Sequence, residues 1–445
     1  MAGYFYIGGE KMDLLIEKGD KRTYLSRYKV ITTSFEESSP SVKRNNTQIQ
    51  YRNGNVDFGG WNEAKTIDYV GYYRADDLED EEYLRERIYA LLSDPEGYYI
   101  TQLKNDNDDS FERPGETSGD YFDKQVNRPS HKRFYVYASS LESELVGSYG
   151  GHVLYKISAT FTTMKLPYGE SVPRNLDVKP NVPYYGRNLL TGTANKTVTG
   201  QNTYGRISNE NDYGTISVFK GLEGQDATVS FDYEYSGFVA GSDKNRLGWE
   251  IGIVTGSTSW ISAWYTPEND SGSGRTSTTF VVPENITGVD EGFGYIQFSN
   301  SGTGTLSNFK LEKGNVATPW SPAPSDPNYN EWYRNTYYNT KNLVIPYAGT
   351  VPCNQLEQGF AIEFTAKEAG SSLKFDLNGT ELTYSGSIVS GDVLKFSGYE
   401  YTKNGISVVK NTNKAYFKLI PEVKNEISCS LAGSIRILDY QELYA

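Results

Sequence analysis

The stretch KLEKGNVATPWSPAPSD, Lys310–Asp326, divides the chain. It starts with strand-like residues, but Pro319, Pro322 and Pro324 follow, and proline cannot donate a hydrogen bond to a sheet. No central strand passes through this segment, which indicates the exit from a domain. More than a hundred residues still follow it. We therefore predict that one domain ends here and that another resumes.

Composition predicts a mainly β protein. The 445 residues, enough for about two to four domains, include 37 tyrosines, 19 phenylalanines and 44 glycines, typical of aromatic-rich strands joined by Gly-rich turns. The net charge of −13 disfavours nucleic acids and anionic membranes as partners. No apolar run reaches the ~18 residues of a membrane span, and the N-terminus lacks a secretory-signal pattern. We expect a protein that is made in a cytoplasm.

The first unit, residues 1–166, combines strands with one helix. Strands are predicted at 67–75, 98–100, 133–139 and 152–163. Between the first two, an amphipathic helix is predicted from an apolar stripe of Leu84, Ile88, Leu91 and Leu92. Asp76 is its predicted N-cap, with Glu79 completing a capping box, and Pro95 and Gly97 end it. The polar segments 34–46 and 105–120 are expected to be long loops that reach a partner.

The remaining chain predicts two β-sandwiches. Residues 186–326 contain short strand patterns, among them 215–222, separated by Gly/Ser/Asn turns, and no helical pattern. Residues 327–445 repeat this organisation. If the Pro-rich segment 167–185 pairs with 327–445, the middle unit is an insertion. Cys353 and Cys429 are expected to be buried thiols, with a disulfide as the alternative.

The order of these units resembles the distal tail proteins of long-tailed phages that infect Gram-positive hosts. In the first unit the resemblance rests on IDYVGYYR, the following helix, KRFYVY and ISATFTTMKLPYGES. NLVIPYAGTVPCNQLEQGFAIEF resembles the family's C-terminal galectin-like sandwich. The middle unit is similar to carbohydrate-binding modules of phage tail proteins at its two edges, GRNLLTGT and FKLEKGNVATPWSPAPSD.

The resemblance implies an N-terminal β-sandwich-like ring domain (1–166), a galectin-like sandwich (167–185 plus 327–445) and an inserted jelly-roll-type carbohydrate-binding module (186–326). It implies a virion protein at the tail tip or baseplate that forms a homo-hexameric ring. Such rings join the tail tube protein to a tail fibre hub protein. The module would hold host cell-wall polysaccharide during adsorption, and no enzymatic activity is implied.

Sugar binding needs flat aromatic faces with amides and carboxylates at their rim. The middle unit offers six candidates on predicted strands, namely Trp249, Trp260, Trp264, Tyr295, Gln297 and Asp232. Trp260 and Trp264 share one face of their strand and would stand ~13 Å apart, which suits two sugars along a chain. A tryptophan in a sandwich strand is more often a core residue than a ligand platform. Trp320 is expected at the base of the module, and Trp61 and Trp332 are assigned to packing.

Catalysis and metal chemistry have weaker signals. Asp232 and Glu234 lie on one strand face and could serve glycoside hydrolysis, but such pairs are common in solvated sheets. The alternative function is therefore a cell-wall polysaccharide hydrolase with an accessory module. His131 and His152 form no ligand cluster, and no cofactor is expected. Loop carboxylates and carbonyls could hold a structural Ca²⁺ in the module, although the sequence names no ligand set.

Overall fold

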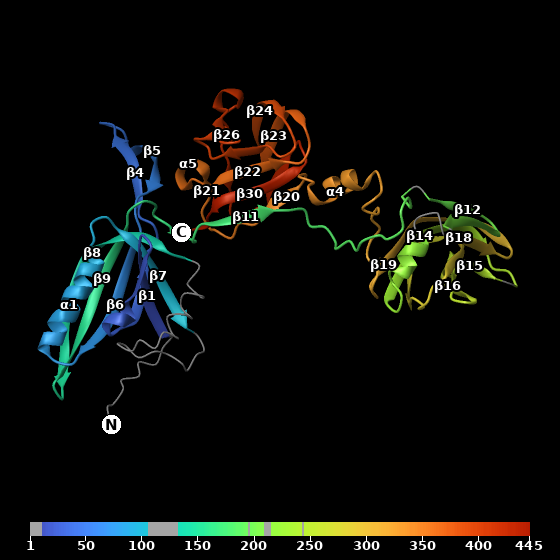
Figure 1. The fold of residues 1–445 in the computed structure, drawn as a ribbon. Coiled ribbons are helices and arrows are strands. Elements are labelled where there is room, and N and C mark those ends of the chain that lie inside the picture. The colour runs from blue at the N-terminus through green and yellow to red at the C-terminus, as the bar shows by residue number, and fades with distance from the viewer. Residues whose placement is uncertain (1–10, 106–131, 195, 209–214, 243) are drawn as a thin grey trace. The chain divides into compact units, whose positions relative to one another are not determined.

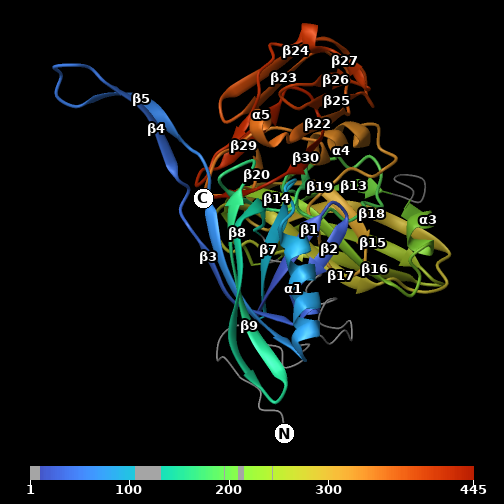
Figure 2. The ribbon, with the colours of Figure 1, turned by 90° about the vertical axis from the view of Figure 1, so that its left-hand side faces the viewer.

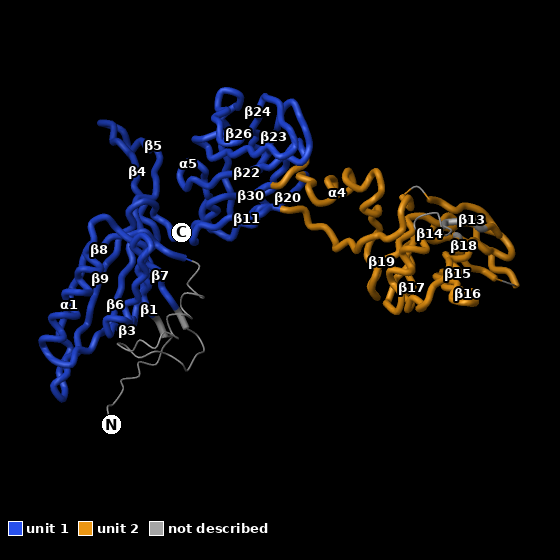
Figure 3. Tube along the Cα trace, in the orientation of Figure 1, with its two compact units in different colours: residues 1–178, 341–431, 435–445 blue, residues 179–340, 432–434 orange. Residues whose placement is uncertain are grey.

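The computed structural model describes residues 11–105, 132–194, 196–208, 215–242 and 244–445. It is mainly β, as predicted. The chain forms two compact units, coloured in Figure 3. The first unit contains Met1–Val178, Lys341–Leu431 and Ile435–Ala445, and the second contains Lys179–Thr340 and Ala432–Ser434. The predicted loop 105–120 lies outside the described residues except for Asn105.

The N-terminal domain is built on one sheet that closes on itself. Its strands are β1 (Lys11–Lys18), β2 (Lys21–Tyr24), β3 (Val30–Glu37), β6 (Thr66–Ala75), β7 (Tyr98–Asn105), β8 (Phe134–Tyr149) and β9 (His152–Thr163). Their order is β2-β1-β3-β6-β9-β8-β7, and β1 also pairs with β7. The strands alternate as the sequence predicts, so that Ile67, Tyr69 and Phe161 fill the interior.

Helix α1 (Leu78–Leu92) covers this core with the predicted stripe, since Leu84, Ile88 and Leu92 are buried. The prediction of Asp76 as its cap is wrong. The helix begins one residue later, because the carboxylate of Asp77 accepts the Asp80 N–H at 2.8 Å. Asp76 forms an ion pair with Lys29 instead.

The prediction that the segment 34–46 is a long loop is wrong, because most of it lies in β3 and β4 (Val42–Gln48). After β3 the segment enters β4, which pairs with β5 (Asn55–Asn62) as a two-stranded arm projecting from the domain (Figures 1 and 2). The arm exposes large apolar side chains at Val42, Ile49, Tyr51, Phe58 and Trp61. The assignment of Trp61 to packing is therefore wrong, since this side chain is 54% exposed.

The C-terminal domain is a two-layer sandwich. Its larger sheet has the order β11-β30-β22-β25-β26-β27, and its smaller sheet has the order β20-β29-β23-β24. The strands of these sheets are β11 (Arg174–Val178), β20 (Leu343–Ile345), β22 (Ala361–Ala366), β23 (Gly370–Leu377), β24 (Thr380–Ile388), β25 (Val393–Phe396), β26 (Tyr401–Lys403), β27 (Ile406–Ser407), β29 (Asn425–Cys429) and β30 (Gly433–Tyr440).

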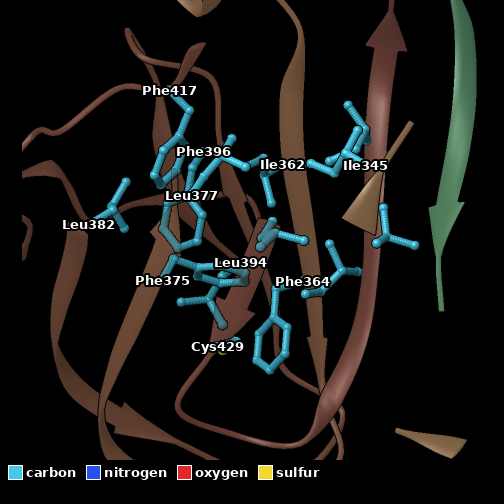
Figure 4. Packing of buried hydrophobic residues seen from close by; sticks show 14 of the residues in the cluster. Ile345, Ile362, Phe364, Phe375, Leu377, Leu382, Leu394, Phe396, Phe417 and Cys429 are labelled. Carbon is cyan, nitrogen blue, oxygen red and sulfur yellow. The ribbon is translucent and has the colours of Figure 1, made fainter. Parts of the chain in front are cut away.

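This domain also contains five short elements: β10 (Gly169–Glu170), β21 (Cys353–Asn354), α5 (Gln355–Gln358), β28 (Lys418–Leu419) and β31 (Leu443–Tyr444). Figure 4 shows its core, in which Phe364, Phe375 and Phe396 pack between the layers. Cys353 and Cys429 are buried free thiols, and burial raises the pKa of each to about 12. Because β11 pairs with β30, residues 179–340 stand between two strands of one domain.

In its described residues, the second unit forms a sandwich of eight strands. One sheet has the order β12-β19-β14-β17 and the other β13-β18-β15-β16. The strands are β12 (Val198–Gly200), β13 (Thr203–Ser208), β14 (Asp226–Val239), β15 (Asn245–Val254), β16 (Thr258–Tyr265), β17 (Gly272–Val281), β18 (Gly288–Phe298) and β19 (Ser301–Lys313). Numbered from one to eight, these strands run 1-8-3-6 and 2-7-4-5, which is the connectivity of a jelly roll.

Two helices in this unit depart from the sequence-based expectation. Residues predicted as a strand at 215–222 form α3 (Thr215–Lys220), because Phe219 and Leu222 both reach the core in a helical turn. Helix α4 (Tyr329–Tyr337) follows the proline segment and packs its Trp332 edge-on against Tyr185, with ring centroids 5.1 Å apart.

A buried ion pair on β19 supports the contact between the first and last segments of the sandwich. Lys310 is 0% exposed and Glu312 is 3% exposed, and their side chains meet at 3.3 Å. Glu312 also accepts the Thr318 N–H at 2.8 Å and the Thr318 hydroxyl at 2.7 Å, and that hydroxyl accepts the Gly186 N–H at 2.8 Å. Burial lowers the pKa of Lys310, and Glu312 opposes this shift.

Asn188 completes this terminal polar network, which comprises Gly186, Asn188, Lys310, Glu312 and Thr318. Its amide donates to the carbonyls of Phe309 and Ser321, and its oxygen accepts the N–H of Leu311 at 3.3 Å. The first and last segments of the sandwich are therefore held side by side. Trp320 is only half-buried beside them, and its indole N–H lies 3.5 Å from the Thr193 hydroxyl.

Replacing Asn188 by alanine should destabilise the second unit by about 3 kcal/mol, because several buried backbone groups lose their partner. Five of the six tryptophans lie in this unit, so tryptophan fluorescence during urea unfolding of the full chain reports on it. Asn315→Ala, at an exposed position in the same segment, is the matched control. Equal unfolding midpoints for Asn188→Ala and the control would show that the network does not stabilise the unit.

Candidate glycan-binding face

Four of the six predicted site residues lie on the outer face of one sheet of the sandwich. Trp260 and Trp264 project from β16, and Tyr295 and Gln297 project from β18. Strand β15 lies between these two strands. The inward residues of β16 confirm this orientation, because Ala263 is buried and Ile261 and Tyr265 pack against the core. We call this surface, together with Arg246 and Glu250 of β15, the aromatic face.

Trp264 and Tyr295 meet across β15. Both are opposite Gly248 in the strand register, and their rings form an edge-to-face pair with centroids 5.5 Å apart. Gly248 makes room for this contact, since a Cβ there would lie 2.8 Å from Trp264 Cε3 and 2.1 Å from the Ala263 carbonyl oxygen. Because Gly248 has no side chain, the Trp264 ring can approach the backbone of β15 at this residue.

Arg246 fixes the other side of Trp264. Its guanidinium carbon lies 3.8 Å from the Trp264 ring centroid, within cation–π distance. Arg246 Nε donates to Gln297 Oε1 at 3.0 Å, and these two residues are paired in the register. Sequence reasoning missed both Arg246 and Glu250, although the two-residue period of the strand places them on the face opposite to Trp249.

Trp260 lies four residues from Trp264 along the edge strand and is 51% exposed. It is opposite Gly252 in the register, and a Cβ at that glycine would lie 3.5 Å from Trp260 Cη2. Thr258 and Asp290 lie nearby, with 3.4 Å between Thr258 Oγ1 and Asp290 Oδ2. The pattern of a tryptophan over a glycine therefore occurs twice on this face.

Two polar residues occupy the interval between the tryptophans. Glu250 and Ser262 face each other in the register and are half-buried. The described part of the chain gives Glu250 no hydrogen-bond or ion-pair partner. Aromatic rings separated by a carboxylate and a hydroxyl can stack on sugar rings and accept bonds from sugar hydroxyls.

Trp249 does not belong to this face. Its side chain is 1% exposed and packs in the core of the sandwich with Leu247 and Ile251. The physical reason is the two-residue period of β15, which places Trp249 inward and its neighbours Gly248 and Glu250 outward. The prediction that Trp249 contacts a ligand is therefore wrong.

Asp232 points outward, as expected, but from the opposite sheet. It lies on β14, and its carboxylate accepts from Arg275 Nη1 and from Asn308 Nδ2, each at 2.7 Å. Both carboxylate oxygens are thus engaged in a structural network. Because Asp232 and the two tryptophans lie on different sheets, Asp232 is not part of the candidate site.

Other chemistry has little support among the described residues. Within them, no three His, Cys, Asp or Glu side chains are grouped closely enough to hold a metal ion. His152 is partly exposed beside Arg74 and Asp76, and His131 lies outside the described residues. In the same part of the chain, no helix is long and apolar enough to cross a membrane.

Comparison with known proteins identifies the N-terminal domain. Residues 20–141 match the family described as phage tail protein RIFT-related domain. The N-terminal domain is a phage tail protein domain. This confirms the resemblance found in the first unit of the sequence and places the protein in the virion tail. No curated protein matches the chain.

Solved structures of phage components are similar to this tail protein at low identity. The Dit protein (gp 19.1) of phage SPP1, described as a paradigm of the hub adsorption apparatus in phages infecting Gram-positive bacteria, is 8% identical with a TM-score of 0.42, over 98% of this chain and 99% of that one. The phage p2 baseplate in its activated conformation with Sr is 11% identical with a TM-score of 0.25, over 70% and 100%. The tripod of the bacteriophage Tuc2009 baseplate is 14% identical with a TM-score of 0.27, over 58% and 98%.

Replacing Gly248 by alanine should destabilise the sandwich and displace the Trp264 ring, because the new methyl group collides with the Ala263 carbonyl. We expect a lower melting temperature of the second unit and altered tryptophan emission. Gly256→Ala is the control, because a Cβ added at Gly256 would meet no atom within 4 Å. Its effect is limited to the strain of an alanine at positive φ. Unchanged melting and emission in Gly248→Ala would show that the close approach at Gly248 is not required.

Proposed function

We propose that this tail protein is a structural subunit of the tail tip, where its N-terminal domain builds a hexameric ring and its inserted sandwich binds host cell-wall polysaccharide. The observation that carries the binding role is the pair of outward tryptophans, Trp260 and Trp264, each lying over a glycine of the neighbouring strand. In a soluble sandwich, outward aromatic rings aligned along one strand suit a ligand with repeated flat apolar faces.

The separation of the two tryptophans supports a polymer rather than a single sugar. Four residues of strand place them ~13 Å apart, which exceeds the reach of one pyranose ring. The surface around them is an open face, which fits a chain that is bound along its length and not at its end. Tyr295 and Arg246 hold Trp264 in place before the ligand arrives, and this lowers the entropy cost of binding.

An open strand edge in the N-terminal domain supports assembly into a ring. Strand β8 pairs with β7 only at Phe134–Val136, and among the described residues its remaining length is paired on one side, by β9. This edge exposes Leu145, Val146 and Tyr149. Long apolar strand edges are templates for pairing with another chain, and a head-to-tail contact of this kind generates closed rings.

The β4–β5 arm supports further partners in the tail. A two-stranded ribbon is marginally stable in water on its own, and this one exposes Phe58 and Trp61. We assign the arm to contacts with neighbouring tail components, which would be the tail tube protein or the tail fibre hub protein. A hydrolase is less favoured, because Asp232 of the candidate carboxylate pair is held by Arg275 and Asn308.

Replacing Trp264 or Trp260 by alanine in the full chain should lower its affinity for purified Gram-positive cell walls at least tenfold, at an unchanged melting temperature. Each ring contributes stacking area that the folded sandwich does not need for its core. A sedimentation assay with cell walls measures the affinity, and Trp332→Ala is a control for a tryptophan outside the aromatic face. Wall binding that survives both substitutions would place the glycan site elsewhere or remove it.

The ring predicts a particle of about 300 kDa, six copies of the 49.8 kDa chain. Light scattering coupled to size-exclusion chromatography measures this mass over a range of concentrations. Introducing lysine at both Leu145 and Val146 should shift the particle toward the monomer mass, because charged side chains disfavour edge pairing. A chain that is strictly monomeric at all concentrations would contradict the ring.

A further inference from the structure

The aromatic face carries an ordered sequence of chemical groups along β15. Outward positions 246, 248, 250 and 252 are Arg, Gly, Glu and Gly, and β16 places Trp264 opposite Gly248, Ser262 opposite Glu250 and Trp260 opposite Gly252. Aromatic and polar positions therefore alternate. Arg246 and Gln297 lie at one end, and Thr258 and Asp290 lie at the other.

Glu250 occupies the centre of this row. It is half-buried, and within the described residues nothing donates a hydrogen bond to its carboxylate. A partly desolvated carboxylate without a donor is unfavourable, and a ligand that supplies hydroxyl donors would relieve this cost. Carboxylates accept at two oxygens, so adjacent hydroxyls of one sugar are a matched partner.

The charges around this row oppose an anionic ligand. Of the described side chains on the face, Glu250 and Asp290 are acidic and Arg246 is basic. The Arg246 guanidinium is already stacked on Trp264 and bonded to Gln297. The segment 186–326 carries nine Lys and Arg residues against fifteen Asp and Glu residues, which gives a net charge of −6. A phosphate polymer would approach a surface of like charge.

We propose that the aromatic face selects an uncharged, hydroxyl-rich glycan lying along β15, with sugar rings stacked on Trp264 and Trp260. Glu250 accepts the hydroxyls of the sugar between them. Glu250 also disfavours polymers of the phosphodiester type. This inference rests on the proposed glycan-binding function and adds the chemical class of the ligand and the residue that sets it.

The test compares two immobilised probes with the full chain. One probe is Gram-positive cell-wall polysaccharide freed of phosphodiester polymers with hydrofluoric acid, and the other is purified poly(glycerol phosphate) teichoic acid. We expect binding to the first probe that persists at about 1 M salt, where the Debye length is about 3 Å. Glu250→Gln should weaken that binding about fivefold, because a charge-assisted hydrogen bond becomes a neutral one.

The control is Glu234→Gln, which removes the same charge from an exposed position on β14 in the other sheet and should leave the affinity unchanged. Equal melting temperatures of both variants exclude unfolding as the cause. Binding to the teichoic acid alone, with loss at high salt, would overturn this inference and leave the proposed function standing. Equal affinity of Glu250→Gln and the native chain would overturn the role of Glu250. Binding to neither probe would overturn the proposed function itself.

Discussion

Both ends of the inserted sandwich have to leave it side by side. The hydrogen bond from the Gly186 N–H to Thr318, which the buried Lys310–Glu312 pair holds in place, keeps them there. Breaking one member of such a pair leaves a charge buried without a partner, which typically costs 3–5 kcal/mol in proteins. Asn188 of the first segment adds hydrogen bonds to Phe309 and Leu311 of the last segment. This network lets a complete jelly roll stand between β11 and β20 without interrupting the sheets of the C-terminal domain.

Strand order within the jelly roll then determines what its surface can bind. Because β15 lies between β16 and β18, side chains from three separate segments of the sequence meet on one face. Gly248 leaves room for the Trp264 ring beside β15, since a Cβ there would lie 2.8 Å from Trp264 Cε3. The opposite sheet presents a different surface, where Asp232 forms an ion pair with Arg275 and accepts a hydrogen bond from Asn308. One sandwich thus has one face with tryptophan rings directed outward and one stabilised by its own polar contacts.

Sequence periodicity predicted much of this arrangement. The helical period correctly placed Leu84, Ile88 and Leu92 on the buried side of α1, and the alternation along the strand correctly placed Trp260 and Trp264 on one face. The same alternation in LGWEIGIV would have placed Trp249 inward, had it been applied there. The location of Asp232 could not be predicted, because the sheet to which a strand belongs depends on pairing across distant segments. Helix α3 was missed because its β-branched residues favour strands, whereas the burial of Phe219 and Leu222 in a helical turn decided its structure.

The central claim concerns where the wall glycan lies on the second unit, and a crystal structure of the full chain with an oligosaccharide released from Gram-positive cell walls tests it most directly. The account predicts sugar rings stacked on Trp264 and Trp260, with hydroxyls within hydrogen-bonding distance of Glu250. Sugar density on the opposite sheet beside Asp232, or confined to the C-terminal sandwich, would contradict it.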